Sequence, residues 1–296
     1  MALLGWRLVP VSLYHLVPLA LSAFSWRALI APPIRPSPGV TLWIRWIRES
    51  INALLPVAQV GGDVASVRLA RPHGVTSVEG AASMVVDTTV GVATQLVFVL
   101  AGVGLLLGRS SDHAALSAVS GLAAGIAVLA VLVAAFVAAQ HRGLFAGLAS
   151  LAHRLAPEAW RLGLPGGAAA IDAAVVATWR RRGPLAGSVL LRLAGWAAGA
   201  GEIWLILRFL GRPLDVADAF ALESLNSGVR AAAFMVPGAL GAQEGGLIVF
   251  GALLGVPADL ALALSLAKRV RELALGLPGL VAWQWAEGRR LLPRRG

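Results

Sequence analysis

Two long stretches without a charged residue constrain the fold of this chain more than any other feature. Residues 88–108 form an uncharged run of 21 positions, and residues 114–140 form another of 27. A helix of about 20 apolar residues crosses the hydrocarbon core of a bilayer. Charged residues make up only 14% of the chain, whereas a soluble domain carries about 25%. The sequence therefore predicts an integral membrane protein.

The excess of basic residues fits the same class. The formal net charge is +10, and the arginines lie between apolar segments and at the C-terminus. Positive residues beside spans set orientation and contact anionic headgroups, and no nucleic-acid-binding motif accompanies them, so we expect no nucleic-acid partner. The chain has no cysteine, and its five histidines show no metal-ligand spacing. We therefore expect no metal and no cofactor, and we expect the histidines to lie at the membrane interface.

The order of apolar segments predicts an all-α, polytopic membrane protein with about six to eight membrane helices, two of them broken and re-entrant. Residues 8–30 are interpreted as a retained first span rather than a cleaved signal peptide. Later spans are expected at 76–108, 115–140, 185–210 and 258–286. A single transmembrane domain, 1–296, is expected to contain a basic interfacial segment at 141–183. The positive-inside rule places this segment and the C-terminus in the cytoplasm, with the chain in a bacterial inner membrane.

Two apolar segments contain helix-breaking residues and an acid, namely "LLPVAQVGGD" (54–63) and "FMVPGALGAQEGG" (234–246). Non-helical backbone is tolerated at membrane depth only where protein or a watery cavity covers it. We therefore predict that each segment is a helix, a break and a returning helix, the first opening from the cytoplasm and the second from the opposite face. The predicted helix-break residues are Pro56, Gly61, Gly62, Pro237, Gly238, Gly241 and Gly245.

The two broken segments also resemble each other. Seven positions separate Pro56 from Asp63, and seven separate Pro237 from Glu244. The words "ESIN" (49–52) and "ESLN" (223–226) match as well. Identity is low, with five matches in 33 positions over 56–88, so the repeat rests mainly on the opposite orientation of the segments. Inverted repeats built around discontinuous helices are a recurrent transporter plan, with halves here at about 40–140 and 185–290.

Polar residues inside apolar segments are the candidate site. An ionised side chain at the bilayer centre costs several kcal/mol, so it pairs, faces a cavity or caps a helix break. Three interpretations remain open: these residues only stabilise helix breaks and ion pairs, they line a groove for a polar headgroup or couple a proton, or they lie at the interface and face water. In the first two, residues 266–276 supply the partners of Glu244 and Asp63. The candidates are Glu49, Asn52, Asp63, Asp87, Glu223, Asn226, Arg230, Glu244, Lys268, Arg269, Arg271 and Glu272.

Several stretches together resemble a known family: "RESINALLPVAQVGGD", "SMVVDTTVGVATQLVF", "GAGEIWLILRFLG", "FMVPGALGAQEGG" and "LSLAKRVRELALGLPGLVAWQWAEGRRL". They are similar to the HpnL-type membrane proteins associated with hopanoid biosynthesis. These proteins belong to the superfamily of the transmembrane, flippase region of lysylphosphatidylglycerol synthases. The similarity runs from about residue 40 to 291 and includes the superfamily pattern of Pro237, Gly238, Gly241 and Glu244. The soluble aminoacyl-transferase domain and about one N-terminal helix of the family are expected to be missing.

The resemblance implies a role in lipid translocation or hopanoid transport. We expect a non-enzymatic transporter or flippase whose partner is a hopanoid, or another anionic or amphiphilic membrane lipid, bound in a groove between the two halves. A non-transporting scaffold or accessory subunit for hopanoid-tailoring enzymes is the alternative, with hopanoid-pathway membrane proteins as partners. An enzyme is disfavoured because no nucleophile or metal set is present.

Overall fold

The computed structural model describes residues 5–56, 60–108, 130–131, 133–148, 164–233 and 236–291. Within these ranges every regular element is a helix. In chain order the elements are η1 (Gly5–Arg7), α1 (Leu8–Tyr14), α2 (Leu16–Leu29), α3 (Pro38–Leu54), α4 (Gly61–Ala70), η2 (Arg71–His73), α5 (Ser77–Leu107), α8 (Leu164–Arg180), α9 (Arg182–Phe209), α10 (Val216–Ala232), η4 (Pro237–Ala239), α11 (Ala242–Leu253) and α12 (Ala258–Leu291).

Three helical stretches are long and apolar enough to cross a membrane, namely Gly5–Leu29, Ser77–Leu107 and Arg182–Phe209. They match the spans predicted at 8–30, 76–108 and 185–210 to within a few residues at each end. The predicted span at 115–140 lies largely outside the described residues. The helix α12 has the length of a span but carries charges in its first half. The predicted all-α, multi-span membrane class is confirmed.

Local sequence signals set the starts of the helices that follow the loops. The Ser37 side chain accepts a hydrogen bond from the N–H of Val40, and Pro38 occupies the first turn of α3, a position that needs no free N–H. Thr76 caps α5 through the N–H of Glu79, and the Glu79 carboxylate accepts a hydrogen bond from the Thr76 hydroxyl. These caps stabilise the first turns of α3 and α5 by satisfying N–H groups that have no partner within the helix.

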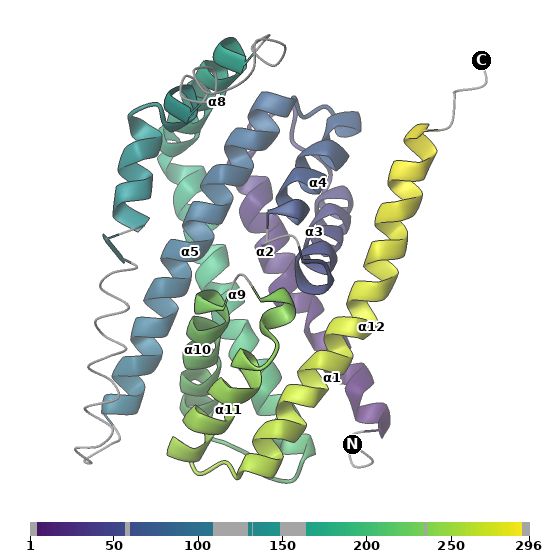
Figure 1. The fold of residues 1–296 in the computed structure, drawn as a ribbon, viewed down its shortest axis with the longest axis vertical. Coiled ribbons are helices and arrows are strands. Elements are labelled where there is room, and N and C mark those ends of the chain that lie inside the picture. Colours follow the sequence, from purple (N-terminus) through teal and green to yellow (C-terminus); the bar gives the residue numbers. More distant parts are fainter. Residues whose placement is uncertain are drawn as a thin grey trace.

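The two broken segments form hairpins that enter from opposite ends of the molecule (Figure 1). The first hairpin is α3 and α4, and the second is α10, η4 and α11. Their tips meet near the middle, where η4 contacts α3. The helix α5 runs away from the open end of the first hairpin, and α12 runs in the reverse direction. The C-terminal end of α12 and α8 both lie at the open end of the first hairpin. The inverted arrangement predicted from the sequence is therefore present.

Packing between the halves follows the same inverted plan. The helices α2 and α9, which precede the two hairpins, pack against each other, while α5 packs against α10 and α12 packs against α3. The repeated serines mark the last two contacts, because Ser50 lies against Gly279 and Ser224 lies against Gly102. Each half also has its own apolar core. The first includes Trp26, Ile44, Ile47, Ile51 and Leu69, and the second includes Ile203, Leu207, Leu222, Leu247 and Leu264.

Candidate functional site

The acids of the two broken segments occupy equivalent positions, each in the first turn of a returning helix. Asp63 lies in the first turn of α4 and Glu244 in that of α11. Glu244 Oε2 accepts a hydrogen bond from the N–H of Gly241 at 2.7 Å. An acid at a helix start is favoured because it meets free N–H groups and the positive end of the helix dipole. The equal spacing from Pro56 and Pro237 therefore predicted a real structural equivalence.

The cationic partners of these two acids come from different helices. Arg269 of α12 donates through Nε to Glu244 Oε1 at 3.2 Å, as the sequence predicted. Asp63 instead binds Arg48 of α3 and accepts a hydrogen bond from Thr88 at 3.2 Å. The prediction that residues 266–276 would supply the partner of Asp63 was wrong. The reason is that α3 and α4 pack side by side as the two arms of one hairpin, which places Arg48 against Asp63.

The tip of the second hairpin requires a glycine. Gly238 has a φ of 58°, and a Cβ on it would lie 2.8 Å from an Arg269 guanidinium nitrogen and 3.4 Å from the carbonyl oxygen of Ala53. A side chain would be strained by the backbone and would also separate the hairpin tip from α3. Gly238 therefore lets the two hairpins meet beside the ion pair of Arg269 and Glu244.

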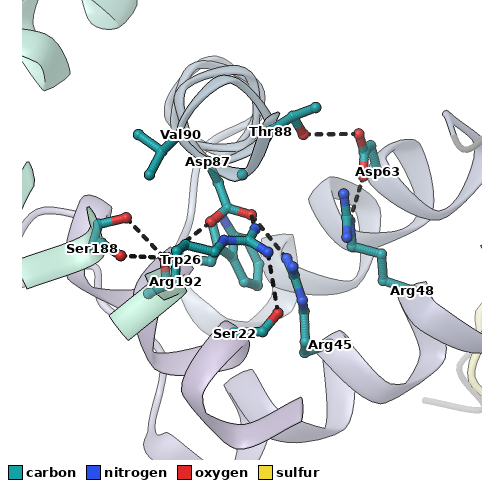
Figure 2. A network of polar contacts seen from close by, with 12 residues as sticks. Ser22, Trp26, Arg45, Arg48, Asp63, Asp87, Thr88, Val90, Ser188 and Arg192 are labelled. Atoms are coloured by element: carbon teal, nitrogen blue, oxygen red, sulfur yellow. Dashed lines mark hydrogen bonds and ion pairs between the residues drawn. The ribbon is translucent and has the colours of Figure 1, made fainter. Parts of the chain in front are cut away.

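Asp87 sits apart from these groups in a sealed ionic cluster (Figure 2). Its carboxylate is fully buried and accepts hydrogen bonds from Arg45 at 2.8 Å and from Arg192 at 2.5 Å. Arg192 also reaches Ser22 at 3.5 Å. The cluster joins α2, α3, α5 and α9, three of which come from the first half and one from the second. Its geometry supports a role in holding helices together, and Asp87 lines no described pocket.

His15, between α1 and α2, lies at the centre of a second polar cluster. Its Nδ1 is 2.8 Å from Glu202 Oε2 on α9, and its Nε2 is 2.7 Å from Glu49 Oε1 on α3. Arg271 of α12 reaches both sides of this arrangement, with a guanidinium nitrogen 3.2 Å from His15 Nε2 and its Nε 3.1 Å from Glu202 Oε1. Three helices that are distant from His15 in the sequence, α3, α9 and α12, thus converge on its imidazole.

Further charges of α12 extend the cluster toward the second hairpin. Lys268 is 2% exposed and its Nζ is 2.6 Å from Glu223 Oε2. Glu272 binds Arg269 at 3.0 Å and Arg230 at 3.3 Å. Lys268 and Glu272 are four positions apart in α12, but Lys268 bonds across to Glu223 of α10. The charged residues of this central network are Glu49, Glu202, Glu223, Glu244, Glu272, Arg230, Lys268, Arg269 and Arg271, together with His15.

The central network opens into a pocket between α2, α3 and α12. The Glu49 side chain is 41% exposed there, whereas those of Arg271 and Glu272 are each 6% exposed. Polar groups form one part of the lining, and apolar side chains such as Leu19 and Leu275 form the other. The lining residues are His15, Leu19, Trp46, Glu49, Ser50, Ala53, Arg271, Glu272, Leu275 and Gly276. The lining combines the polar and apolar partners that the two ends of an amphiphile need, around a cavity of about 20 Å³.

The two repeated asparagines have structural positions and do not line this pocket. Asn52 Oδ1 accepts a hydrogen bond from the N–H of Gly62 at 2.9 Å and so joins the two arms of the first hairpin. Asn226 is fully buried and lies against Gly246 of the second hairpin. The residues of the two matching motifs, ESIN and ESLN, therefore have different roles: the glutamates enter the ionic network, the serines pack against glycines, and the asparagines face the returning arm.

Sequence reasoning missed His15 and gave no role to Glu202 or Arg192. The expectation of an interfacial histidine does not hold for His15, which is 13% exposed and bonded to two acids. The sequence could have indicated Glu202 and Arg192 as functional candidates, since each is a charged residue inside the apolar stretch 185–210. Among the described residues no group of His, Asp or Glu has the arrangement of a metal site.

The comparisons with known proteins agree with this architecture at the level of the family. The family model described as the lysylphosphatidylglycerol synthase TM region matches residues 1–279. The matched range includes both hairpins and every residue of the central network. No curated protein and no solved structure matches the chain. Because the match covers nearly the whole sequence, this chain belongs to the lysylphosphatidylglycerol synthase transmembrane-region family.

Proposed function

We propose that this protein moves an amphiphilic lipid between membrane leaflets, with the lipid headgroup passing through the pocket beside Glu49. The observation that carries the proposal is the acidic side chain of Glu49 on α3, which is 41% exposed near the tip of a hairpin that ends in the middle of the molecule. A carboxylate exposed to hydrocarbon is costly, so a polar ligand or water must contact it. The family membership supports a lipid-related role.

The pocket offers what a headgroup needs during transfer. A polar group loses several kcal/mol when it leaves water for hydrocarbon without new hydrogen bonds. His15, Glu49 and Arg271 supply donors and acceptors that replace that water, while Leu19 and Leu275 contact the apolar part of the lipid. The protein acts as a transporter in this account, without a chemical step on the lipid.

The substrate class that we propose is a hopanoid or a related amphiphilic lipid in a bacterial inner membrane. Support comes from the stretches that resemble the hopanoid-associated branch, "ALGAQEGG" and "WQWAEGRRL". A polyol or amino headgroup also fits the chemistry of the pocket, because Glu49 accepts hydrogen bonds from hydroxyls and pairs with an ammonium group. The orientation that we propose places the C-terminus and the open end of the first hairpin in the cytoplasm.

Reconstituted liposomes test the proposal. Purified protein is expected to accelerate leaflet exchange of a labelled amino- or polyol-hopanoid, with labelled phosphatidylethanolamine as a second probe. Glu49→Gln is expected to slow exchange about tenfold, because a hydrogen bond to a charged group contributes about 1.5–3 kcal/mol. Asp259→Asn is the matched control, since Asp259 is an exposed acid at the start of α12, and it is expected to exchange lipid at the wild-type rate.

Two results would contradict the proposal. Wild-type protein that leaves exchange at the rate of empty liposomes for both probes would exclude translocation and favour the scaffold or accessory subunit. Equal rates for Glu49→Gln and wild type would exclude this pocket as the path. Size-exclusion profiles of all three proteins establish that they are equally folded.

A further inference from the structure

The hydrogen bonds around His15 fix one of its two ring nitrogens. Nδ1 lies 2.8 Å from Glu202 Oε2, and Glu202 is also bound by Arg271 through Nε at 3.1 Å and a terminal nitrogen at 3.0 Å. A carboxylate held by a guanidinium is ionised and only accepts hydrogen bonds. Nδ1 must therefore carry a hydrogen and donate it to Glu202. Any change of protonation at His15 takes place at Nε2.

The surroundings of Nε2 cannot all be satisfied at once. Nε2 faces Glu49 Oε1 at 2.7 Å and an Arg271 guanidinium nitrogen at 3.2 Å. A guanidinium only donates and an ionised carboxylate only accepts. Protonated Nε2 therefore donates to Glu49 and has no bond with Arg271, whereas bare Nε2 accepts from Arg271 and leaves Glu49 without a donor. The two states differ by one proton and by the availability of Glu49.

The charge count of the network points to the same two states. The central network holds five glutamates, three arginines and one lysine besides His15. It is therefore neutral when His15 is protonated and carries one net negative charge when His15 is neutral. Glu49 is the most exposed of the five, at 41%, and it faces the pocket. A cation from the membrane meets that uncompensated charge at Glu49.

We propose that a proton at His15 Nε2 and a cationic lipid headgroup exclude one another at Glu49, so that the pocket exchanges one proton for one headgroup bearing an ammonium group. The headgroup forms an ion pair with Glu49, and the displaced proton passes to water while Nε2 accepts from Arg271. No bond of the lipid changes. This inference rests on the proposed headgroup pocket and adds its charge class and its coupling ion.

The charged groups that face the ring come from three helices. They are Glu49 on α3, Glu202 on α9 and Arg271 on α12, with Glu272 of α12 lining the same pocket. Lys268 and Glu223 lie further along the network and bind each other at 2.6 Å. Glu202 is already bound to Arg271, Glu272 to Arg269 and Lys268 to Glu223. Among the described residues, Glu49 is therefore the common partner of the proton and the headgroup.

Proton release on ligand binding tests the inference without transport. Dodecyltrimethylammonium is the probe, because it is a permanent cation and any proton released comes from the protein. Full-length protein in a neutral maltoside detergent and weak buffer is expected to release up to about one proton per bound probe near the ordinary pKa of histidine, about 6.5, and none near pH 9, where Nε2 is already bare. Wild-type protein that binds no probe, or binds it without releasing protons at either pH, would overturn the inference.

His15→Gln identifies the source of the proton. Glutamine retains an N–H for Glu202 but does not titrate, so this variant is expected to bind the probe with no proton release at either pH. Release equal to that of wild type would overturn the assignment to His15. If the variant does not fold, the ¹⁵N chemical shift of His15 Nε2 is measured in wild-type protein instead. Binding of the probe is expected to move this chemical shift from the value of a protonated nitrogen to that of an unprotonated one. An unchanged chemical shift with the probe bound would contradict the mutual exclusion of proton and headgroup.

A liposome experiment separates the inference from the proposed function. A pH gradient is expected to change the rate of exchange of a cationic lipid, and to leave the rate for an uncharged polyol lipid unchanged. Exchange that is rapid and independent of the gradient, with no proton release in detergent, would overturn proton coupling and leave translocation standing. Proton release that depends on His15 but is accompanied by no lipid exchange would overturn translocation and leave the proton exchange at the pocket standing.

Discussion

The acidic residues inside this membrane protein divide into a sealed group and an accessible one. Asp87 is fully buried between two arginines, and Asp63 is 19% exposed beside Arg48. Glu49 is 41% exposed and shares its histidine partner with Glu202. The sealed acids have the features of structural ion pairs, which are costly to break because the remaining charge stays buried. The accessible acid has the features of a binding group.

A substitution at Asp87 tests the structural role of the sealed group. Asp87→Asn leaves Arg45 and Arg192 buried without their shared counter-ion, so we expect a loss of about 3–5 kcal/mol in stability. A large decrease in thermal denaturation temperature and in folded yield would report it. Asp259→Asn, at an exposed position, is the control and should behave as wild type. Equal denaturation temperatures for Asp87→Asn and the control would show that the Asp87 cluster does not stabilise the fold.

The sequence predicted which residues form ion pairs where a single charged residue stands among apolar neighbours. That signal singled out Asp87 and Glu244, both of which have ionic partners in the structure. The choice of partner was predictable for Glu244 and not for Asp63, because it depends on which helices become neighbours after folding. His15 was missed for a related reason. Its polar surroundings come from α3, α9 and α12, and none of them is near it in the sequence.

At the scale of elements, the matching motifs of the two broken segments predicted the two hairpins, although the sequence identity between the segments is low. Asp63 and Glu244, which are equally spaced from the two prolines, lie in the first turns of α4 and α11. The end of the second break comes early in the sequence, because α11 begins at Ala242, before the apolar run that starts at Leu247. The helix starts earlier because Glu244 bonds to the N–H of Gly241, which favours a helical turn in a stretch rich in glycine.

The contact between the first hairpin and α12 is open to a direct test. A Cβ on Gly279 would collide with the Ser50 side chain, so Gly279→Ala is expected to lower stability by about 1–3 kcal/mol through overpacking. Adding Ser50→Gly removes the collision and should restore part of the loss in thermal denaturation. Gly288→Ala is the matched control in the same helix, because a Cβ there meets nothing within 4 Å. Equal stability of Gly279→Ala and Gly288→Ala would show that α12 does not pack closely on α3.

At the scale of the whole molecule, the account rests on two hairpins that enter from opposite faces and bury an ionic network where they meet. The hydropathy of the chain predicted the membrane class, and the basic segments predicted that the C-terminus and residues 141–183 share one side, as α8 and the end of α12 do in Figure 1. The span expected at 258–286 corresponds to α12, and the charges of this helix find partners on α9, α10 and α11 as well as within α12 itself.

The sidedness of the two hairpins is the measurement that tests this central claim most directly. The chain contains no cysteine, so single cysteines can be introduced by His73→Cys, Ala258→Cys and Gly288→Cys at exposed positions. An impermeant thiol reagent is applied to intact and to permeabilised membranes. The account predicts that His73→Cys and Gly288→Cys react from one side, which we propose is the cytoplasm, and that Ala258→Cys reacts from the other. Labelling of His73→Cys and Ala258→Cys from the same side would contradict it.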